Sequence, residues 1–410
     1  MESLPDDVLC HILSFLPTRD AVATSLLSKR WKPLWLSFRS FDLDDNYFSD
    51  FHRFSNFVTS SPQSIQSLRL TCGSHFTFEF EDVEEDAFDL FLYRLSFKGI
   101  QELDLCLVTL IELPFGFYTC NNLVTLKLDN VTFKDGSSYI NFPLLKSLNL
   151  NDVVFGNRAN MFDFFCGCPN VEDVEVTSLS IVNSRIPQPP EEGVEALPKL
   201  VRAKISELHS MLPLLCNAQF LYAGVSYWCC NPTFHNLIHM DITLELISCD
   251  VMWNWFAQVL QNCPNLQNLT VQKVCLICFW SSCILNIISH ILFLTKIKLC
   301  VYCTQKYACV KKHGNDVHWK DPQIIPQCLS SRLKTFKFKS FNDFDCEVQF
   351  AKYIMQNSKV LQNMTIHTTL DIDLKHPMLE TLSLCPMGSA TCNLHFDLES
   401  AQHLRRPTAL

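Results

Sequence analysis

One spacing of apolar residues recurs along most of this chain and limits the folds that it can adopt. The pattern is apolar-x-x-apolar-x-apolar, and its last two apolar residues are two positions apart, so their side chains lie on one face of a short strand. In the middle of the chain successive starts are 23, 22, 26 and 29 residues apart. The instances are Ile65-Leu68-Leu70, Ile100-Leu103-Leu105, Leu123-Leu126-Leu128, Leu145-Leu148-Leu150, Val171-Val174-Val176, Leu200-Ala203-Ile205, Phe220-Ala223-Val225, Leu237-Met240-Ile242, Leu266-Leu269-Val271, Leu333-Phe336-Phe338, Leu361-Met364-Ile366 and Leu379-Leu382-Leu384.

A strand of this kind cannot bury its apolar side chains alone, so such repeats fold by stacking on their neighbours. Apolar helical stretches at residues 161–165 and 253–260 each precede a Cys-Pro-Asn turn and then the next strand. Helix, turn and strand therefore alternate. The sequence predicts an α/β fold, a curved leucine-rich-repeat solenoid with parallel strands on one face and helices on the other. We expect its broad strand face to be the binding surface.

The first 40 residues have a different, helical pattern. A first helix that ends at Pro17 carries an apolar stripe at i, i+3, i+4 and i+7, formed by Leu9, Ile12, Leu13 and Leu16. Thr18 and Asp20 can cap a second helix, and Ser28 can cap a third helical turn. Helices this short cannot bury their apolar surface among themselves, so they either cap the repeats or face a partner.

The order and spacing of these N-terminal residues decide between the two alternatives. Leu4-Pro5-Asp6-Asp7-Val8-Leu9, then Ile12-Leu13-Ser14-Phe15-Leu16-Pro17, Leu27-Ser28-Lys29-Arg30-Trp31 and Leu34-Trp35 closely resemble the F-box. This resemblance implies docking onto the small adaptor subunit of SCF cullin-RING ubiquitin ligases. Carried over position by position, the residues that would form or support the adaptor face are Leu4, Pro5, Val8, Ile12, Leu13, Leu16, Pro17, Val22, Leu27, Trp31, Leu34 and Trp35.

Two later segments resemble other parts of plant F-box proteins. The phrases LVTLKLDNVTF and LLKSLNLNDVVF are similar to the irregular repeats of that family. The segment that starts at Gln327-Cys328-Leu329-Ser330-Ser331 and ends at Leu361-Gln362-Asn363-Met364 looks like the FBD domain, a strand, helix and strand unit that follows the repeats. The resemblance assigns the FBD no settled biochemical role.

An apolar segment at residues 274–305 interrupts the repeats. It contains no acidic residue, Gly or Pro, and it separates two successive strand motifs by 67 residues. Its uncharged run suggests a membrane helix, Cys275-x-x-Cys278 and Cys300-x-x-Cys303 suggest a zinc site, and a buried extra repeat is a third reading. A fourth reading is a retained intron or a gene-model error. Intron sequence is T-rich, and T-rich codons encode residues of this kind. Deletion of the segment also shortens the distance between the two strand motifs to 35 residues. We take this last reading as our hypothesis.

Composition and missing motifs argue against several classes of function. The 33 basic and 42 acidic residues give a net charge of -9, so we expect no nucleic-acid partner. The start of the chain lacks a signal-peptide pattern, so we interpret its 21 cysteines as reduced thiols in cytoplasm or nucleus, and we expect no membrane partner. Motifs of phosphate loops, zinc proteases and serine hydrolases are missing, so we predict no catalytic activity, metal or cofactor.

Together these features predict a substrate-recognition subunit of an SCF-type ligase. The F-box would bind the adaptor and, through it, cullin, and the solenoid would bind an unknown target protein. The expected regions are an F-box at 1–45, repeats at 60–272, the insert at 274–305, an FBD-like unit at 320–370, and a last repeat and tail at 371–410. The alternatives are a repeat scaffold outside any ligase, or a non-functional product of intron retention.

Overall fold

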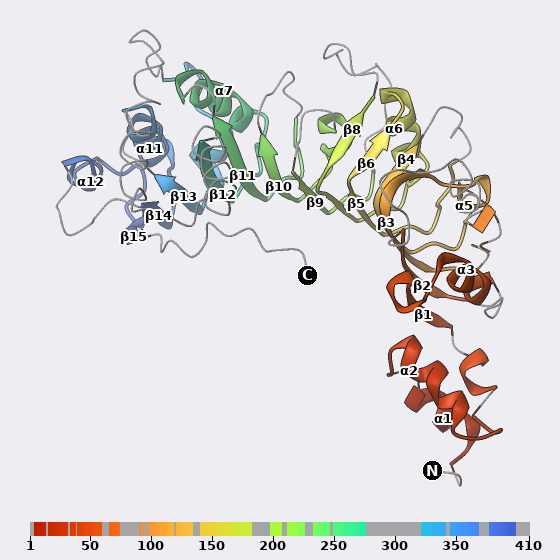
Figure 1. The fold of residues 1–410 in the computed structure, drawn as a ribbon. Coiled ribbons are helices and arrows are strands. Elements are labelled where there is room, and N and C mark those ends of the chain that lie inside the picture. Colours follow the sequence, from red (N-terminus) through yellow and green to blue (C-terminus); the bar gives the residue numbers. More distant parts are fainter. Residues whose placement is uncertain are drawn as a thin grey trace, which may run out of the picture. The chain divides into compact units, whose positions relative to one another are not determined.

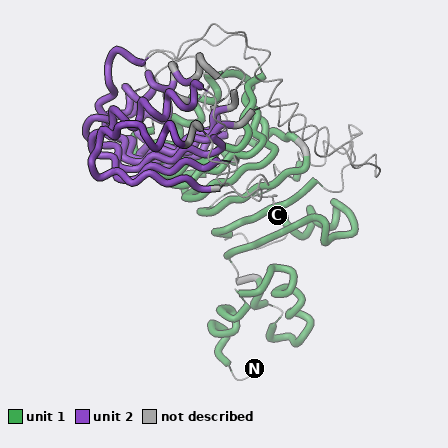
Figure 2. Tube along the Cα trace, turned by 90° about the vertical axis from the view of Figure 1, so that its left-hand side faces the viewer, with its two compact units in different colours: residues 1–200 green, residues 201–410 purple. Residues whose placement is uncertain are grey.

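The chain forms two compact units, residues 1–200 and 201–410 (Figure 2). The computed structural model describes residues 4–13, 15–31, 33–37, 39–59, 65–73, 90–91, 93, 95, 97, 99–118, 120–133, 140–182, 197–206, 211–225, 233–246, 249–275, 321–341, 345–368 and 377–398. Both units are mixed α/β and contain parallel strands, as predicted. One continuous solenoid through both units stays a prediction.

The N-terminal region of the first unit is helical, as its sequence pattern predicts. It contains α1 (Asp6–Leu13), α2 (Thr18–Ala23) and the 3-10 helices η1 (Thr24–Leu26) and η2 (Leu34–Ser37). The predicted cap of α2 is wrong: Pro17 occupies the N-cap position and no side chain caps the helix. The Thr18 hydroxyl instead accepts a hydrogen bond from the backbone N–H of Asp42, at 2.8 Å.

Parallel strands form the rest of the first unit (Figure 1). They are β1 (Ser40–Asp44), β2 (Ser67–Cys72), β3 (Glu102–Glu112), β4 (Thr125–Phe133), β5 (Ser147–Asn151) and β7 (Asp173–Val176), hydrogen-bonded in that order. The short strands β6 (Val153–Phe155) and β8 (Leu179–Ile181) extend the ladder from the end of β4. The helical elements are η3 (Asp45–Tyr47), α3 (Phe51–Thr59), α5 (Phe115–Tyr118) and α6 (Arg158–Cys166).

The register of these strands places equivalent motif residues side by side. Leu103 of β3 pairs with Leu68 of β2 and Leu126 of β4, and all three are buried. Each fully buried Leu contributes about 1.5–3 kcal/mol from leaving water. The residue between each pair of buried positions faces outward. The strand motif is therefore confirmed as a one-faced strand.

The second unit repeats this design. Its strands are β9 (Arg202–Ile205), β10 (Phe220–Val225), β11 (His239–Leu246), β12 (Asn268–Cys275), β13 (Thr335–Phe341), β14 (Asn363–Thr368) and β15 (Asn393–Leu398), parallel and neighbouring in chain order. Its helical elements are η4 (Leu212–Leu215), α7 (Cys249–Gln261), α10 (Gln327–Ser331), α11 (Asp345–Asn357) and α12 (Pro377–Ser383). The helical stretches predicted at 161–165 and 253–260 are confirmed as α6 and α7.

Two of the predicted strand motifs are wrong. In β10 the buried residues are Leu221 and Ala223, which pair with Ala203 and Ile205 of β9, so the motif is shifted by two residues from the predicted one. The last predicted motif, at Leu379-Leu382-Leu384, lies in and just after helix α12, and the last strand is β15. Leu379 and Leu382, at i and i+3, also suit one face of a helix, and Leu384 follows the end of α12, so the first part of the motif alone cannot distinguish a strand from a helix.

The parallel array begins earlier than the sequence motif suggested. Strand β1 lies inside the segment assigned to the F-box, and its buried Phe41 and Leu43 pair with Leu68 and Leu70 of β2. The same motif spacing is present at Phe38, Phe41 and Leu43, but these residues lie in the segment assigned to the F-box and were therefore not counted as a repeat.

Most of the apolar segment lies outside the described residues. Strand β12 includes its first two residues, Val274 and Cys275, and residues 276–320 are not described. The membrane, zinc, extra-repeat and intron readings all fall on that part of the chain. Among the described residues, none of the helices is long and apolar enough to cross a membrane.

Candidate functional site

The N-terminal helices form a small core of their own. Leu9 and Leu13 lie on the buried side of α1, with at most 1% of each side chain exposed. Trp31 and Leu34, from the last helical turns, are 7% and 6% exposed. These residues come from α1 and from the last helical turns, which contact each other, so the core holds the two segments together.

Six large apolar residues of these helices are exposed. Val8 and Ile12 of α1 lie one turn apart and are 42% and 40% exposed. The other four are Phe15, Leu16, Leu26 and Leu27, which are 75%, 40%, 87% and 68% exposed. We call these six residues the apolar face. Exposed apolar residues of this size are candidates for a protein interaction site.

An arginine joins the two ends of this helical region. The Arg30 guanidinium donates hydrogen bonds to the Asp6 carboxylate at 2.7 and 3.0 Å, and to the backbone carbonyl of Leu4. The ion pair is exposed, so its free energy is on the order of 0–1 kcal/mol. Its main effect is therefore to fix the Leu4-Pro5 segment beside the third helical turn.

Helix α2 covers the open edge of β1. In addition to the Thr18 hydrogen bond, the Arg19 guanidinium lies over the Tyr47 ring, 5.3 Å from its centre. The Trp35 ring stacks on Phe57 of α3, with ring centres 5.9 Å apart. These contacts seat the N-terminal helices against the first strand of the sheet.

The structure divides the predicted adaptor residues into two groups. Pro5, Val8, Ile12, Leu16, Pro17 and Leu27 are exposed, whereas Leu4, Val22 and Trp35 are half-buried. Leu13, Trp31 and Leu34 are buried in the helical core, so they can only support the face from behind. Truncating Leu13 or Trp31 therefore acts first on the fold of these helices, not on a contact with a partner.

Sequence reasoning missed two members of the apolar face. Phe15 and Leu26 are the most exposed of its residues, yet neither was assigned to it. Phe15 directly precedes Leu16, and Leu26 precedes Leu27, so each lies beside an assigned residue. Their exposure follows from the turns at the ends of α1 and η1, which no residue spacing specifies.

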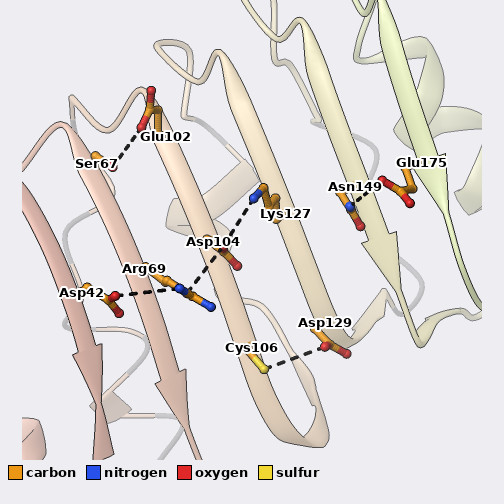
Figure 3. A network of polar contacts seen from close by, with 10 residues as sticks. All are labelled: Asp42, Ser67, Arg69, Glu102, Asp104, Cys106, Lys127, Asp129, Asn149 and Glu175. Atoms are coloured by element: carbon orange, nitrogen blue, oxygen red, sulfur yellow. Dashed lines mark hydrogen bonds and ion pairs between the residues drawn. The ribbon is translucent and has the colours of Figure 1, made fainter. Parts of the chain in front are cut away.

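The outward face of the first unit's strands carries a ladder of charges (Figure 3). Arg69 lies between Asp42 and Asp104, 3.8 Å from each carboxylate, and Lys127 lies 3.7 Å from Asp104. The Ser67 hydroxyl donates a hydrogen bond to Glu102 at 3.0 Å. Each cation is thus bracketed by, or adjacent to, carboxylates on neighbouring strands.

Partial burial affects the ionisable groups at the Asp129 end of this ladder. Burial raises the pKa of the Asp129 carboxyl, a hydrogen bond from the Asn151 amide opposes that rise, and the charge of Asp152 adds to it. Burial and the nearby Asp129 also raise the pKa of the Cys106 thiol. The thiol is therefore protonated at neutral pH and donates to Asp129. It is a structural donor and not an activated nucleophile.

In the part of the chain that the structure describes, no group of three or more His, Cys, Asp or Glu side chains could hold a metal ion.

Comparison with protein families identifies two regions of the chain. The family model for the F-box domain matches residues 1–43, and the model named FBD matches residues 321–366. The chain is a relative of the plant F-box/FBD/LRR-repeat proteins. It is 27% identical to an F-box/FBD/LRR-repeat protein of Arabidopsis thaliana, with 97% of this chain and 98% of the relative covered. An FBD-associated F-box protein of the same plant is 25% identical, with 96% and 98% covered.

The FBD of this chain has the predicted strand, helix and strand order. Helix α11 connects β13 to β14, which are parallel neighbours. The FBD packs on the preceding repeat: Glu347 of α11 forms a fully buried ion pair with Lys273 of β12, and the Phe350 ring stacks on Trp253 of α7 at 4.7 Å. The FBD and the repeat before it therefore share one core.

Proposed function

We propose that this chain is the substrate-recognition subunit of an SCF-type cullin-RING ubiquitin ligase. In this proposal the F-box binds the adaptor subunit and, through it, cullin, and the outward strand faces bind a target protein. In this role the chain itself performs no covalent chemistry. It acts by raising the local concentration of target lysines near a ubiquitin-charged enzyme. Such a role takes place in the cytoplasm or nucleus.

The apolar face is the observation that carries the proposal. Leu9, Leu13, Trp31 and Leu34 are buried in the core of the F-box, whereas the six large residues of the apolar face are exposed. If the helices were only a cap for the repeats, that apolar surface would be turned toward β1. Contacts with β1 and the elements after it are made instead by residues such as Thr18, Arg19 and Trp35, none of which belongs to the apolar face.

A capture experiment with the recombinant adaptor subunit tests this proposal. Ile12→Asp places a charge on the apolar face, and we expect adaptor affinity to fall by about a hundredfold or more, because an unpaired charge is costly to bury in an interface. The matched control is Leu384→Asp. Leu384 is an apolar residue that is 77% exposed in the second unit, so the same change there should leave capture unchanged.

The outcomes separate the proposal from its alternatives. Folding of each variant is checked first by circular dichroism. If folded wild-type chain fails to capture the adaptor, or if Ile12→Asp captures it as well as Leu384→Asp does, the adaptor role is refuted. A repeat scaffold that acts without a ligase then becomes the leading function.

A further inference from the structure

A cavity of about 220 Å³ is lined by residues of helix α2, strand β1 and the helices that follow β1. Its apolar wall consists of Val22 of α2, Leu43 of β1, and the rings of Tyr47, Phe48 and Phe57. An apolar cavity of about 150 Å³ is large enough to hold a benzene molecule, so this cavity has room for a ring with a short polar chain. Its wall therefore suits a small ligand that carries an apolar or aromatic group.

Arg19 of α2 adds a positive charge to the wall of this cavity. Its guanidinium lies over the Tyr47 ring, 5.3 Å from the ring centre. Within the part of the chain that the structure describes, no carboxylate forms an ion pair with Arg19. Both Arg19 and Tyr47 are exposed, so a ligand can reach this side of the cavity from solvent. The guanidinium can bind a carboxylate of that ligand through two N–H groups.

Asp42 and Asp44 of β1 add two carboxylates to the same wall, and they differ in their partners. The Asp42 carboxylate lies 3.8 Å from the Arg69 guanidinium. The Asp44 carboxylate uses one oxygen, Oδ1, to accept hydrogen bonds from the backbone N–H and the side-chain amide of Asn46, each at 2.9 Å. Among the described residues, no cation forms an ion pair with Asp44. Its second oxygen can therefore accept an ammonium group of a ligand.

The free edge of β1 adds a backbone acceptor. On the β2 side, the carbonyl of Arg39 accepts a hydrogen bond from the backbone N–H of Ser67 at 2.9 Å. Backbone groups alternate in direction along a strand, so the N–H and C=O groups of Asp42 point to the opposite side, toward α2. That N–H is bonded to Thr18, and no described residue donates a hydrogen bond to the Asp42 carbonyl. This carbonyl is a second acceptor for an ammonium group.

We propose that this cavity binds a small zwitterion of the amino-acid type with an apolar or aromatic side chain. A ligand with only one charge would cover either Arg19 or Asp44 without pairing it, and a polar group that loses water without gaining a partner costs affinity. A zwitterion satisfies both groups: its carboxylate binds Arg19, its ammonium group binds Asp44, and its side chain packs on the aromatic rings. The inference goes beyond the proposed function, because neither the adaptor nor a target protein takes part in it.

Isothermal titration calorimetry with the full chain tests this inference. The probes are L-phenylalanine and L-leucine. The matched controls are 3-phenylpropanoate, which is phenylalanine without the ammonium group, and 2-phenylethylamine, which is phenylalanine without the carboxylate. We expect at least one of the two amino acids to bind. We expect each single-charge analogue to bind at least about tenfold more weakly than phenylalanine, because it leaves one charged group of the cavity unpaired.

Variants then locate the binding site. Arg19→Gln and Asp44→Asn should each weaken binding of the amino acid by about tenfold or more. The matched controls are Arg53→Gln and Asp50→Asn, at an exposed pair that does not line the cavity. Asp50, like Asp44, accepts a hydrogen bond from a backbone N–H at the start of a helical segment, so its control makes the same change in a similar setting. Both controls should alter the affinity by less than about twofold.

Three results would overturn the inference: no binding of either amino acid, equal binding of phenylalanine and its single-charge analogues, or equal affinities of the Arg19→Gln and Arg53→Gln variants. Thermal unfolding verifies that each variant is folded and gives a second readout, because a ligand that binds the folded chain raises its unfolding temperature. Adaptor capture is measured on the same samples. Ligand failure with capture retained removes only this inference, whereas a wild-type chain that binds the amino acid but does not capture the adaptor supports it and refutes the proposed function.

Discussion

At the scale of single residues, the buried ion pair between Lys273 and Glu347 should contribute to the stability of the second unit. Their side chains are 4% and 0% exposed, and neither charge reaches water. Removing one member of a buried pair leaves the other charge uncompensated, which costs about 3–5 kcal/mol. We therefore expect Glu347→Gln to lower the unfolding temperature of the chain markedly. Replacing both residues, as Lys273→Met with Glu347→Leu, should restore much of the loss.

An exposed pair provides the control for that measurement. Lys146 and Glu172 lie 3.4 Å apart with 61% and 43% of their side chains exposed. Glu172→Gln should change stability by less than about 1 kcal/mol, because water screens this pair. Differential scanning calorimetry of the variants compares the two sites. A Glu347→Gln variant that melts like Glu172→Gln would show that the buried pair contributes little.

At the scale of elements, helix α2 acts as a cover for the edge of β1. A parallel strand at an edge has unpaired backbone N–H groups, and Thr18 satisfies that of Asp42. Thr18→Val keeps the shape and removes the acceptor, so we expect faster hydrogen exchange of the β1 amides and a loss of about 1–3 kcal/mol. Thr18→Ser keeps the hydroxyl and should exchange like the wild-type chain. Equal exchange in the Val and Ser variants would contradict this role.

The elements also show how far the sequence alone could lead. The strand motif located the buried residues of β2 and β12 correctly, because alternate burial on a parallel sheet requires apolar residues two positions apart in the sequence. It misplaced β10, where the small Ala218 and Ala223 take core positions beside Leu221 and give a weak signal. In the F-box the sequence identified the family residues, but the division between core and apolar face depends on how three short segments pack.

At the scale of the whole molecule, the order of strands bears on the apolar segment. Strands β12 and β13 are hydrogen-bonded neighbours, with Leu269 beside Phe336, although their motifs start 67 residues apart. Adjacent repeats elsewhere in the chain have far shorter connections, so we expect that a chain lacking residues 276–305 would still join the two strands and keep all of β12. We expect the shortened chain to unfold at an equal or higher temperature and to aggregate less.

Size-exclusion chromatography and calorimetry of the two chains measure that outcome. A shortened chain that is less soluble, or that loses the cooperative unfolding of the second unit, would show that the segment contributes to the fold. Sequencing of the transcript gives an independent test of the intron hypothesis. Detection of the long form alone would refute it.

The alternation of buried and outward residues along each strand affects how the sequences of such chains can evolve. The inward side chains are packed against their equivalents on neighbouring strands, so substitutions there are costly. The outward positions have no such constraint, and exchanges on the surface usually alter stability by less than about 0.5 kcal/mol. Binding specificity can therefore diversify one strand at a time, and no intermediate along that path needs to be unstable.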